Sequence, residues 1–173
     1  PCADLVPPLS VLKAKIVIAG ASGQISLDIG ELISGVKRDT LGQDELITEF
    51  IIPEYDDSWR SSFMKKGRVA VADLALVNVA VCLRMDNDNR CSEARITLGA
   101  VAPVPVRAEK AEKALSGKVI DADIAREAGR IASTEISPID DVRSSAEYRR
   151  TMSLILTERA ILKARDSVAQ GRA

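Results

Sequence analysis

The sequence predicts an α+β protein in which antiparallel strands come first and helices follow. Residues 15–102 hold short apolar or alternating runs separated by turn-forming Gly, Pro, Asn and Asp. Residues 107–164 are rich in Ala, Glu, Lys and Arg, with apolar residues at helical spacing. Strands followed by helices are typical of the α+β class. A length of 173 residues fits one domain, or one domain plus part of another.

Composition excludes several classes of function. Hydrophobic residues at 46% with 28% charged residues are typical of a folded protein, and only 3% are aromatic, so Val, Ile, Leu and Ala must build the core. A net charge of −1 gives no electrostatic footprint for nucleic acid. No apolar run approaches the roughly 20 residues of a membrane span, and no signal peptide is visible. Histidine is absent, which removes the commonest general base and zinc ligand, so we predict neither catalytic residues nor a metal site.

The cysteines indicate a reducing, cytoplasmic setting. Cys2, Cys82 and Cys91 show no CxxC spacing, and their odd number argues against a disulfide framework. Cys82 lies in an apolar run and is expected to be a small buried hydrophobe. The chain opens on Pro1 without an initiator Met, so we expect a fragment of a longer protein.

The first part is expected to cover residues 1–57. A helix over 4–12 carries Pro7 and Pro8 in its first turn, where a missing N–H costs little, and Asp4 is a plausible cap. The other elements expected here are strands over 15–19, 25–29 and 45–52, and a loop over 30–42 with one helical turn. The Gly20–Gly23 segment could be a phosphate loop, but it lies between two strands and not before a helix, which favours a hairpin turn.

The second part, residues 58–173, is expected to hold a small antiparallel sheet and three helices. A cationic strand over 60–68 precedes a buried strand over 73–84, and the polar turn 86–89 joins it to a strand over 91–102.

Three helices should follow the sheet. The first, over 107–115, stops at Ser116 and Gly117, and the second spans 120–134. Ser144 and Glu147 fit a capping box for the third. That helix places a core stripe at helical spacing: Tyr148, Met152, Ile155, Leu156 and Leu162.

Four stretches of the second part resemble one family, the FAD subunit of molybdenum-containing hydroxylases of the carbon monoxide dehydrogenase and xanthine dehydrogenase type. They occur in the family's order and at about its spacing: SFMKKGR at 62–68, DLALVNVAV at 73–81, LGAVAPVPVRA at 98–108 and DVRSSAEYRR at 141–150. The first part resembles the end of the FAD-binding domain of the same subunit, in PCADLVPP at 1–8 and ELITEFIIP at 45–53. The two glycine-rich loops that hold the FAD diphosphate in this family have no counterpart here.

The resemblance implies three cofactor-binding residues. Asp4 matches a carboxylate that hydrogen-bonds FAD near its ribityl-phosphate region, with the helix cap as the alternative. Ile47 matches an apolar position near the isoalloxazine ring, with ordinary strand core as the alternative. Lys65 matches a lysine at the flavin, where an ammonium favours negative charge on the ring, with a solvated lysine as the alternative. Lys66 should face the other side of the strand.

The family's last motif, around Asp141, Arg143, Tyr148 and Arg149, is read as structural. The two arginines are expected to pair with acids or to reach a neighbouring subunit.

The resemblance implies the C-terminal part of an oxidoreductase subunit that relays electrons through FAD, between iron–sulfur clusters and an external acceptor such as NAD. The implied partners are an iron–sulfur subunit and a subunit with the molybdenum cofactor. The chain alone should be inactive and bind FAD weakly. The alternative is a non-catalytic α+β module that docks onto partner subunits.

Overall fold

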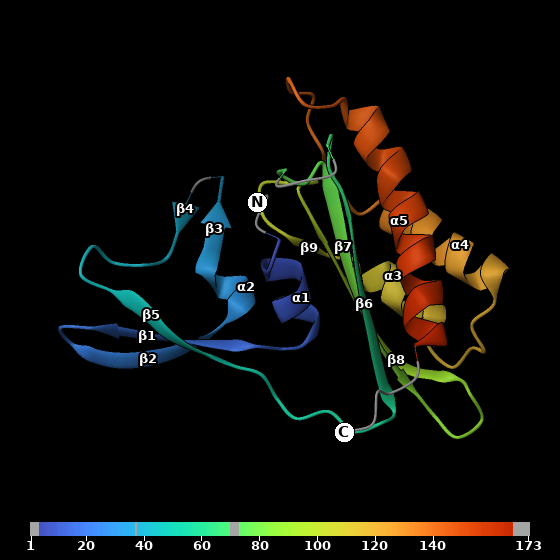
Figure 1. The fold of residues 1–173 in the computed structure, drawn as a ribbon, viewed down its shortest axis with the longest axis horizontal. Coiled ribbons are helices and arrows are strands. Elements are labelled where there is room, and N and C mark those ends of the chain that lie inside the picture. The colour runs from blue at the N-terminus through green and yellow to red at the C-terminus, as the bar shows by residue number, and fades with distance from the viewer. Residues whose placement is uncertain (1–3, 37, 70–72, 168–173) are drawn as a thin grey trace.

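A four-stranded antiparallel sheet lies between helices on both of its faces (Figure 1). The computed structural model describes residues 4–36, 38–69 and 73–167. In chain order the elements are α1 (Val6–Val11), β1 (Lys15–Gly20), β2 (Gly23–Asp28), α2 (Ile29–Leu32), β3 (Ile33–Gly35), β4 (Arg38–Asp39), β5 (Leu46–Ile51), β6 (Trp59–Lys66), β7 (Val77–Met85), β8 (Cys91–Gly99), β9 (Val106–Arg107), α3 (Glu109–Leu115), α4 (Ala122–Ala132) and α5 (Ala146–Asp166). The predicted α+β class is confirmed.

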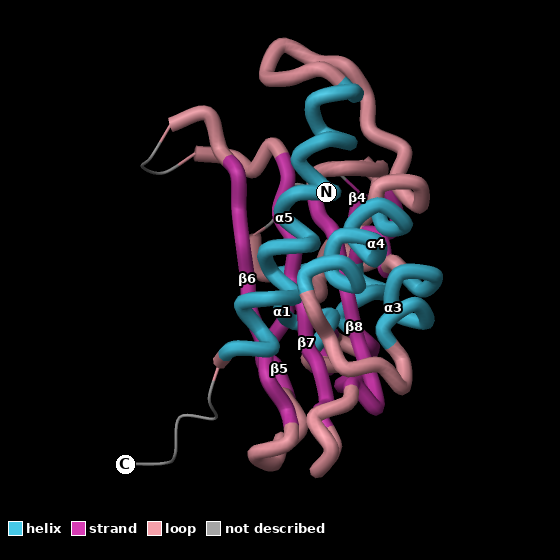
Figure 2. Tube along the Cα trace, turned by 90° about the vertical axis from the view of Figure 1, so that its right-hand side faces the viewer, coloured by secondary structure: helices cyan, strands magenta, loops and turns pink. Residues whose placement is uncertain are grey.

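The central sheet has the strand order β6-β7-β8-β9. Helices α3, α4 and α5 cover one face, with α5 across β6 and β7 and α3 beside β8 (Figure 2). Helix α1 covers part of the other face (Figure 1). Because β7 is buried on both faces, its residues are apolar on both sides instead of alternating, except for Asn78 and the exposed Arg84.

The two faces of β7 belong to different clusters. Val77, Val79, Val81 and Leu83 pack into the main core with the three C-terminal helices. Ala80 and Cys82 face α1, where they meet Val11. Cys82 is buried, as predicted.

A second sheet, of order β2-β1-β5, holds a smaller core. Its buried residues are Val6, Ile16, Ile18 and Ile29. The segment from Gly20 to Gly23 is the turn of the β1–β2 hairpin, as expected, and Gly23 has a positive φ of 118°. Residues 33–35 and 38–39, within the stretch predicted as loop, form the short β3–β4 pair. Strands of two or three residues are too short to show a pattern in the sequence.

Two predictions about α5 are wrong. Ser145, not Ser144, caps the helix and accepts from the Tyr148 N–H at 3.2 Å, because Ser144 is held in a backbone bridge with Asp141. Tyr148 is exposed rather than core. The buried face of α5 holds Arg149, Ser153 and Thr157 beside apolar residues. A search for apolar residues at helical spacing therefore does not identify this face correctly.

The polar turn at 86–89 is confirmed. Asn89 has a φ of 58°, and the Asp86 carboxylate accepts from the backbone N–H groups of Asp88 and Arg90. Among the helices that the structure describes, none could span a bilayer.

Candidate functional site

An ion pair joins the start of the chain to the central sheet. Lys65 Nζ on β6 lies 2.5 Å from Asp4 Oδ2, two residues before α1. The side chains are 27% and 41% exposed, so the pair lies at the protein surface with one side open to solvent. The structure thus brings together two of the three residues that the sequence assigned to a cofactor.

Asp4 does not cap the helix. The N-cap position of α1 is Leu5, and no side chain bonds to the first turn there. The Asp4 carboxylate instead turns to the sheet, so the capping alternative is wrong. Its role toward a flavin stays a prediction.

Strand alternation places Lys65 on the α1 side of β6. Met64 on the opposite side packs against the main core, and Ser62 donates a hydrogen bond to the Ala160 carbonyl of α5 at 2.6 Å. Lys66, also on that side, lines an open cavity of about 490 Å³ together with residues at the start of α5. The prediction that Lys65 and Lys66 face opposite sides is confirmed.

Beyond Lys65, the chain at Arg68 and Val69 is fastened to Asp73. The Asp73 carboxylate accepts from the backbone N–H groups of Arg68 and Val69, the latter at 3.1 Å. These two hydrogen bonds hold the pKa of Asp73 below its usual range.

Asn78 is the site residue that sequence reasoning missed. It is fully buried on β7, opposite Lys65, and its Nδ2 donates to Asp4 Oδ1 at 3.3 Å. The signal was a single amide inside an apolar run, a placement that costs free energy unless the amide is bonded.

Ile47 lies elsewhere. It is half-buried on β5 and packs against the smaller core that includes Val6 and Ile18. The same core includes Val6, the first residue of α1. The core alternative describes its packing in this structure, and contact with an isoalloxazine ring stays a prediction.

A buried arginine fastens the far end of α1 to the sheet. Arg95 on β8 donates to the Val11 carbonyl at 3.0 Å and to Tyr55 Oη at 2.9 Å, and its guanidinium lies 4.2 Å from the Trp59 ring centroid. Tyr55 Oη in turn donates to the Leu12 carbonyl at 2.7 Å. Tyr55, in the segment before β6, therefore helps to anchor the helix that follows Asp4.

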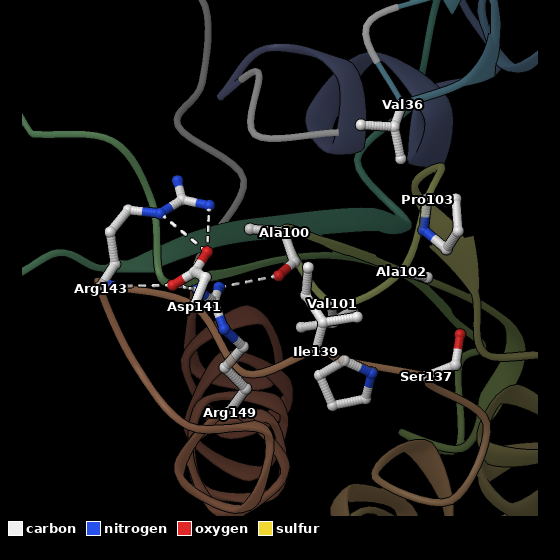
Figure 3. A pocket seen from close by; sticks show the side chains of 11 residues that line it. Val36, Ala100, Val101, Ala102, Pro103, Ser137, Ile139, Asp141, Arg143 and Arg149 are labelled. Atoms are coloured by element: carbon white, nitrogen blue, oxygen red, sulfur yellow. Dashed lines mark hydrogen bonds and ion pairs between the residues drawn. The ribbon is translucent and has the colours of Figure 1, made fainter.

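The last family motif forms a separate charged cluster (Figure 3). Asp141 lies between Arg143 and Arg149, at 2.6 Å and 2.9 Å. Arg149 is 2% exposed and also donates to the carbonyls of Leu76 and Ala100 at 2.6 and 3.1 Å. The predicted pairing of both arginines with an acid is confirmed, and the bonds to three segments make this cluster structural.

A cavity of about 220 Å³ adjoins that cluster. Its other walls are mostly apolar and include Val101, Pro103 and Ile139 (Figure 3). Hydrogen bonds from Arg143 hold the pKa of Asp141 well below its usual range, against the opposing effect of desolvation. Asp141 therefore stays ionised and is unsuited to proton transfer near neutral pH.

Cys82 and Cys91, the cysteines in the described part of the chain, are free and buried. Burial raises the pKa of Cys82 and that of Cys91 to about 11. A thiol with so high a pKa holds little thiolate at neutral pH, so we expect neither to react readily. Cys2 lies outside the described residues.

Comparison with known proteins finds two family matches. Residues 62–164 match the CO dehydrogenase flavoprotein C-terminal domain. Residues 1–55 match the FAD binding domain in molybdopterin dehydrogenase. Asp4 and Lys65 thus come from different matched regions.

Individual relatives agree with both matches. The chain is 29% identical over 160 residues to the glyceraldehyde dehydrogenase medium chain of Sulfolobus acidocaldarius, covering 92% of this chain and 56% of that one. It is 27% identical to the carbon monoxide dehydrogenase medium chain of Hydrogenophaga pseudoflava, covering 90% and 54%. The crystal structure of quinoline 2-oxidoreductase from Pseudomonas putida 86 superposes with a TM-score of 0.86 at 31% identity, over 94% of this chain and 56% of that one. The chain spans slightly more than half the length of these relatives.

Proposed function

Since the chain belongs to the CO dehydrogenase flavoprotein C-terminal domain family, we propose that it is the C-terminal part of an FAD-carrying subunit of a molybdenum-containing hydroxylase or dehydrogenase. The subunit relays electrons between iron–sulfur clusters and an external acceptor. The chain divides into the end of the FAD-binding domain, residues 1–57, and the flavoprotein C-terminal domain, residues 58–173.

The observation that carries this proposal is the ion pair between Asp4 and Lys65. One residue lies in the region that matches the FAD-binding domain and the other in the region that matches the C-terminal domain. Neither family match requires the two to touch, yet the fold places them 2.5 Å apart at the surface. A cofactor bound there would touch both regions at once.

The residues present fit a flavin. Lys65 offers donors and a positive charge, and Asp4 offers carboxylate oxygens, which suit the carbonyl and hydroxyl groups of FAD. FAD, when bound, supplies the exchange of electrons between one partner and another.

This chain's residues would tune that exchange and not perform bond chemistry. The Lys65 ammonium favours negative charge on a neighbouring flavin ring by Coulomb attraction, which solvent screens only partly at a half-open site. Asp4 orients the ammonium and offsets part of its charge. Ile47 would give an apolar contact to the ring from β5.

The wider assembly is proposed on the same basis. The partners are an iron–sulfur subunit and a subunit with the molybdenum cofactor, and NAD or another carrier accepts the electrons. A cytoplasmic location agrees with the two free buried cysteines. By itself the chain is inactive and binds FAD weakly.

A second candidate function is a docking module without a cofactor role. It is favoured by two exposed apolar side chains in the segment before α5, Ile139 and Val142. In that case the pair of Asp4 and Lys65 serves stability alone.

A double-mutant cycle on FAD affinity separates the two functions. The subunit of full family length is compared with its Asp4→Asn, Lys65→Met and double variants, and the FAD dissociation constant is measured by flavin fluorescence. Each single change should weaken binding by about tenfold, and the double change by less than the product, because the two groups act on one ligand. Unchanged affinity in all three variants, with altered subunit assembly, would support the docking module. As a control, Arg159→Ala changes an exposed charge on α5 and should leave affinity unchanged.

A further inference from the structure

Asn78 is a polar residue in a strand, β7, whose other buried residues are apolar. It is 0% exposed among them. A valine or leucine would satisfy the same position without a polar group to bond. An amide at this position therefore calls for a role that packing does not supply.

The surroundings of Asn78 are shaped for its amide. In the sheet register it lies between Lys65 on β6 and Gly99 on β8. A Cβ at position 99 would collide with Asn78 Oδ1 and would lie 3.0 Å from Pro7 Cγ of α1. The glycine thus leaves the room that the amide occupies beneath the helix.

The hydrogen bonds of Asn78 are few and specific. Its Nδ2 donates a hydrogen bond to Asp4 Oδ1, while Asp4 Oδ2 accepts one from Lys65 Nζ. Its Oδ1 has no partner among the described residues. An unpaired buried acceptor destabilises the fold, so the amide does not serve stability.

We infer that Asn78 is a positioning residue that fixes the Asp4 carboxylate against the Lys65 ammonium. Two donors from neighbouring strands hold the two oxygens of one carboxylate, which sets its rotation as well as its place. Because the amide is neutral, it does so without adding charge to the pair. Without Asn78, Asp4 would be held by a half-exposed ion pair alone, a weak constraint. The consequence for a bound flavin rests on the proposed function.

The reactivity of Lys65 tests the positioning directly and needs no flavin. In the flavin-free subunit of full family length, the rate of Lys65 acetylation by acetic anhydride is measured by mass spectrometry. Asn78→Leu should raise this rate about three- to tenfold, toward the value in Asp4→Asn, because a freed ammonium is more accessible. Thr97→Val is the matched control, since Thr97 is also buried beneath α1 but bonds Ser10 Oγ, away from the pair. An unchanged Lys65 rate in Asn78→Leu overturns the inference.

Stability and potential complete the test. Asn78→Leu should leave the melting temperature unchanged or raised, and Asn78→Ala, which opens a cavity, should give the same Lys65 rate at lower stability. In the FAD-loaded subunit, Asn78→Leu should lower the flavin midpoint potential in the direction of Lys65→Met, with Thr97→Val unchanged. If the midpoint potential shifts in Lys65→Met but not in Asn78→Leu, Asn78 does not act on the flavin, and that part of the inference is overturned. If Lys65→Met itself leaves the potential unchanged, the proposed function fails, and the acetylation rate alone decides the role of Asn78.

Discussion

The two sheets of this protein differ in how much of their surface the chain itself covers. The central sheet has helices on both faces and a core of fully buried residues from β7, β8 and three helices. The sheet of β1, β2 and β5 buries few side chains, and β5 leaves Leu46, Phe50 and Ile51 exposed. The candidate site lies where the two regions meet. From this difference we expect the central sheet to contribute most of the stability of this chain. The smaller sheet should gain stability when further protein covers its exposed apolar side chains.

The largest effect should come from the buried arginine of α5. Arg149→Leu removes the bonds to the carbonyls of Leu76 and Ala100 and leaves Asp141 with one arginine fewer, so we expect a loss of about 3–5 kcal/mol in unfolding free energy. Urea unfolding measures it. Arg159→Ala, an exposed change on the same helix, is the control and should cost less than about 0.5 kcal/mol. If Arg149→Leu also cost less than about 0.5 kcal/mol, the stability of the central region would not depend on its buried charged cluster, and the contrast between the two regions would fail.

The same cluster should make the central region sensitive to acid. The folded-state pKa of Asp141 is depressed, so its stabilisation is fully present above the unfolded-state pKa of about 3.9 and is lost as pH falls from there through the folded-state value. We expect a loss of about 2 kcal/mol below about pH 4, as is usual for carboxylates held by ion pairs. Urea titrations at decreasing pH measure it, with Asp141→Asn as the variant that should lack this component. An identical acid slope in both proteins would contradict the assignment.

A smaller effect is expected where α4 and α5 touch. A Cβ on Gly129 would lie 2.6 Å from the Leu154 carbonyl oxygen, so Gly129→Ala must push the two helices apart. The higher helix propensity of Ala offsets part of the strain, and the net loss should be about 1–2 kcal/mol. Gly30→Ala in α2 meets no atom within 4 Å and is the matched control. A stabilised Gly129→Ala variant would show that the packing there is looser than the structure indicates.

The smallest effect should come from the exposed strand. Phe50 on β5 is 53% exposed, so Phe50→Ser should change the stability of this chain by less than about 0.5 kcal/mol. In the subunit of full family length we expect a larger loss, because further protein would cover this strand. Thermal unfolding of both forms measures the contrast. Equal small losses in both would remove the distinction between the two sheets.

Local patterns in the sequence were enough for the fold class and most elements. The apolar run over 73–84 predicted β7, and Ser116 and Gly117 predicted the end of α3. Both features are visible because burial of a strand and turn formation depend on a few neighbouring residues. The α5 face was misplaced, since Arg149, Ser153 and Thr157 are polar yet buried on it, which a pattern of apolar residues does not indicate. Arg149 reaches Leu76, a separation that no helical spacing encodes.

The candidate site was predictable only in part. Asp4 and Lys65 were found from family motifs, yet their contact depends on how α1 lies on the sheet. That placement rests on Arg95, Tyr55 and Trp59, which read as ordinary strand and junction residues in the sequence. Asn78 carried a visible signal, but its meaning required the register that sets it beside Lys65.

Hydrogen exchange with and without flavin tests the central claim most directly. In the subunit of full family length, FAD binding should slow amide exchange in residues 4–12 and 60–68, and leave α3 and α4 unchanged, because a flavin there contacts the meeting point of the two regions. Unchanged exchange in both segments, with protection confined to other parts of the subunit, would contradict the account.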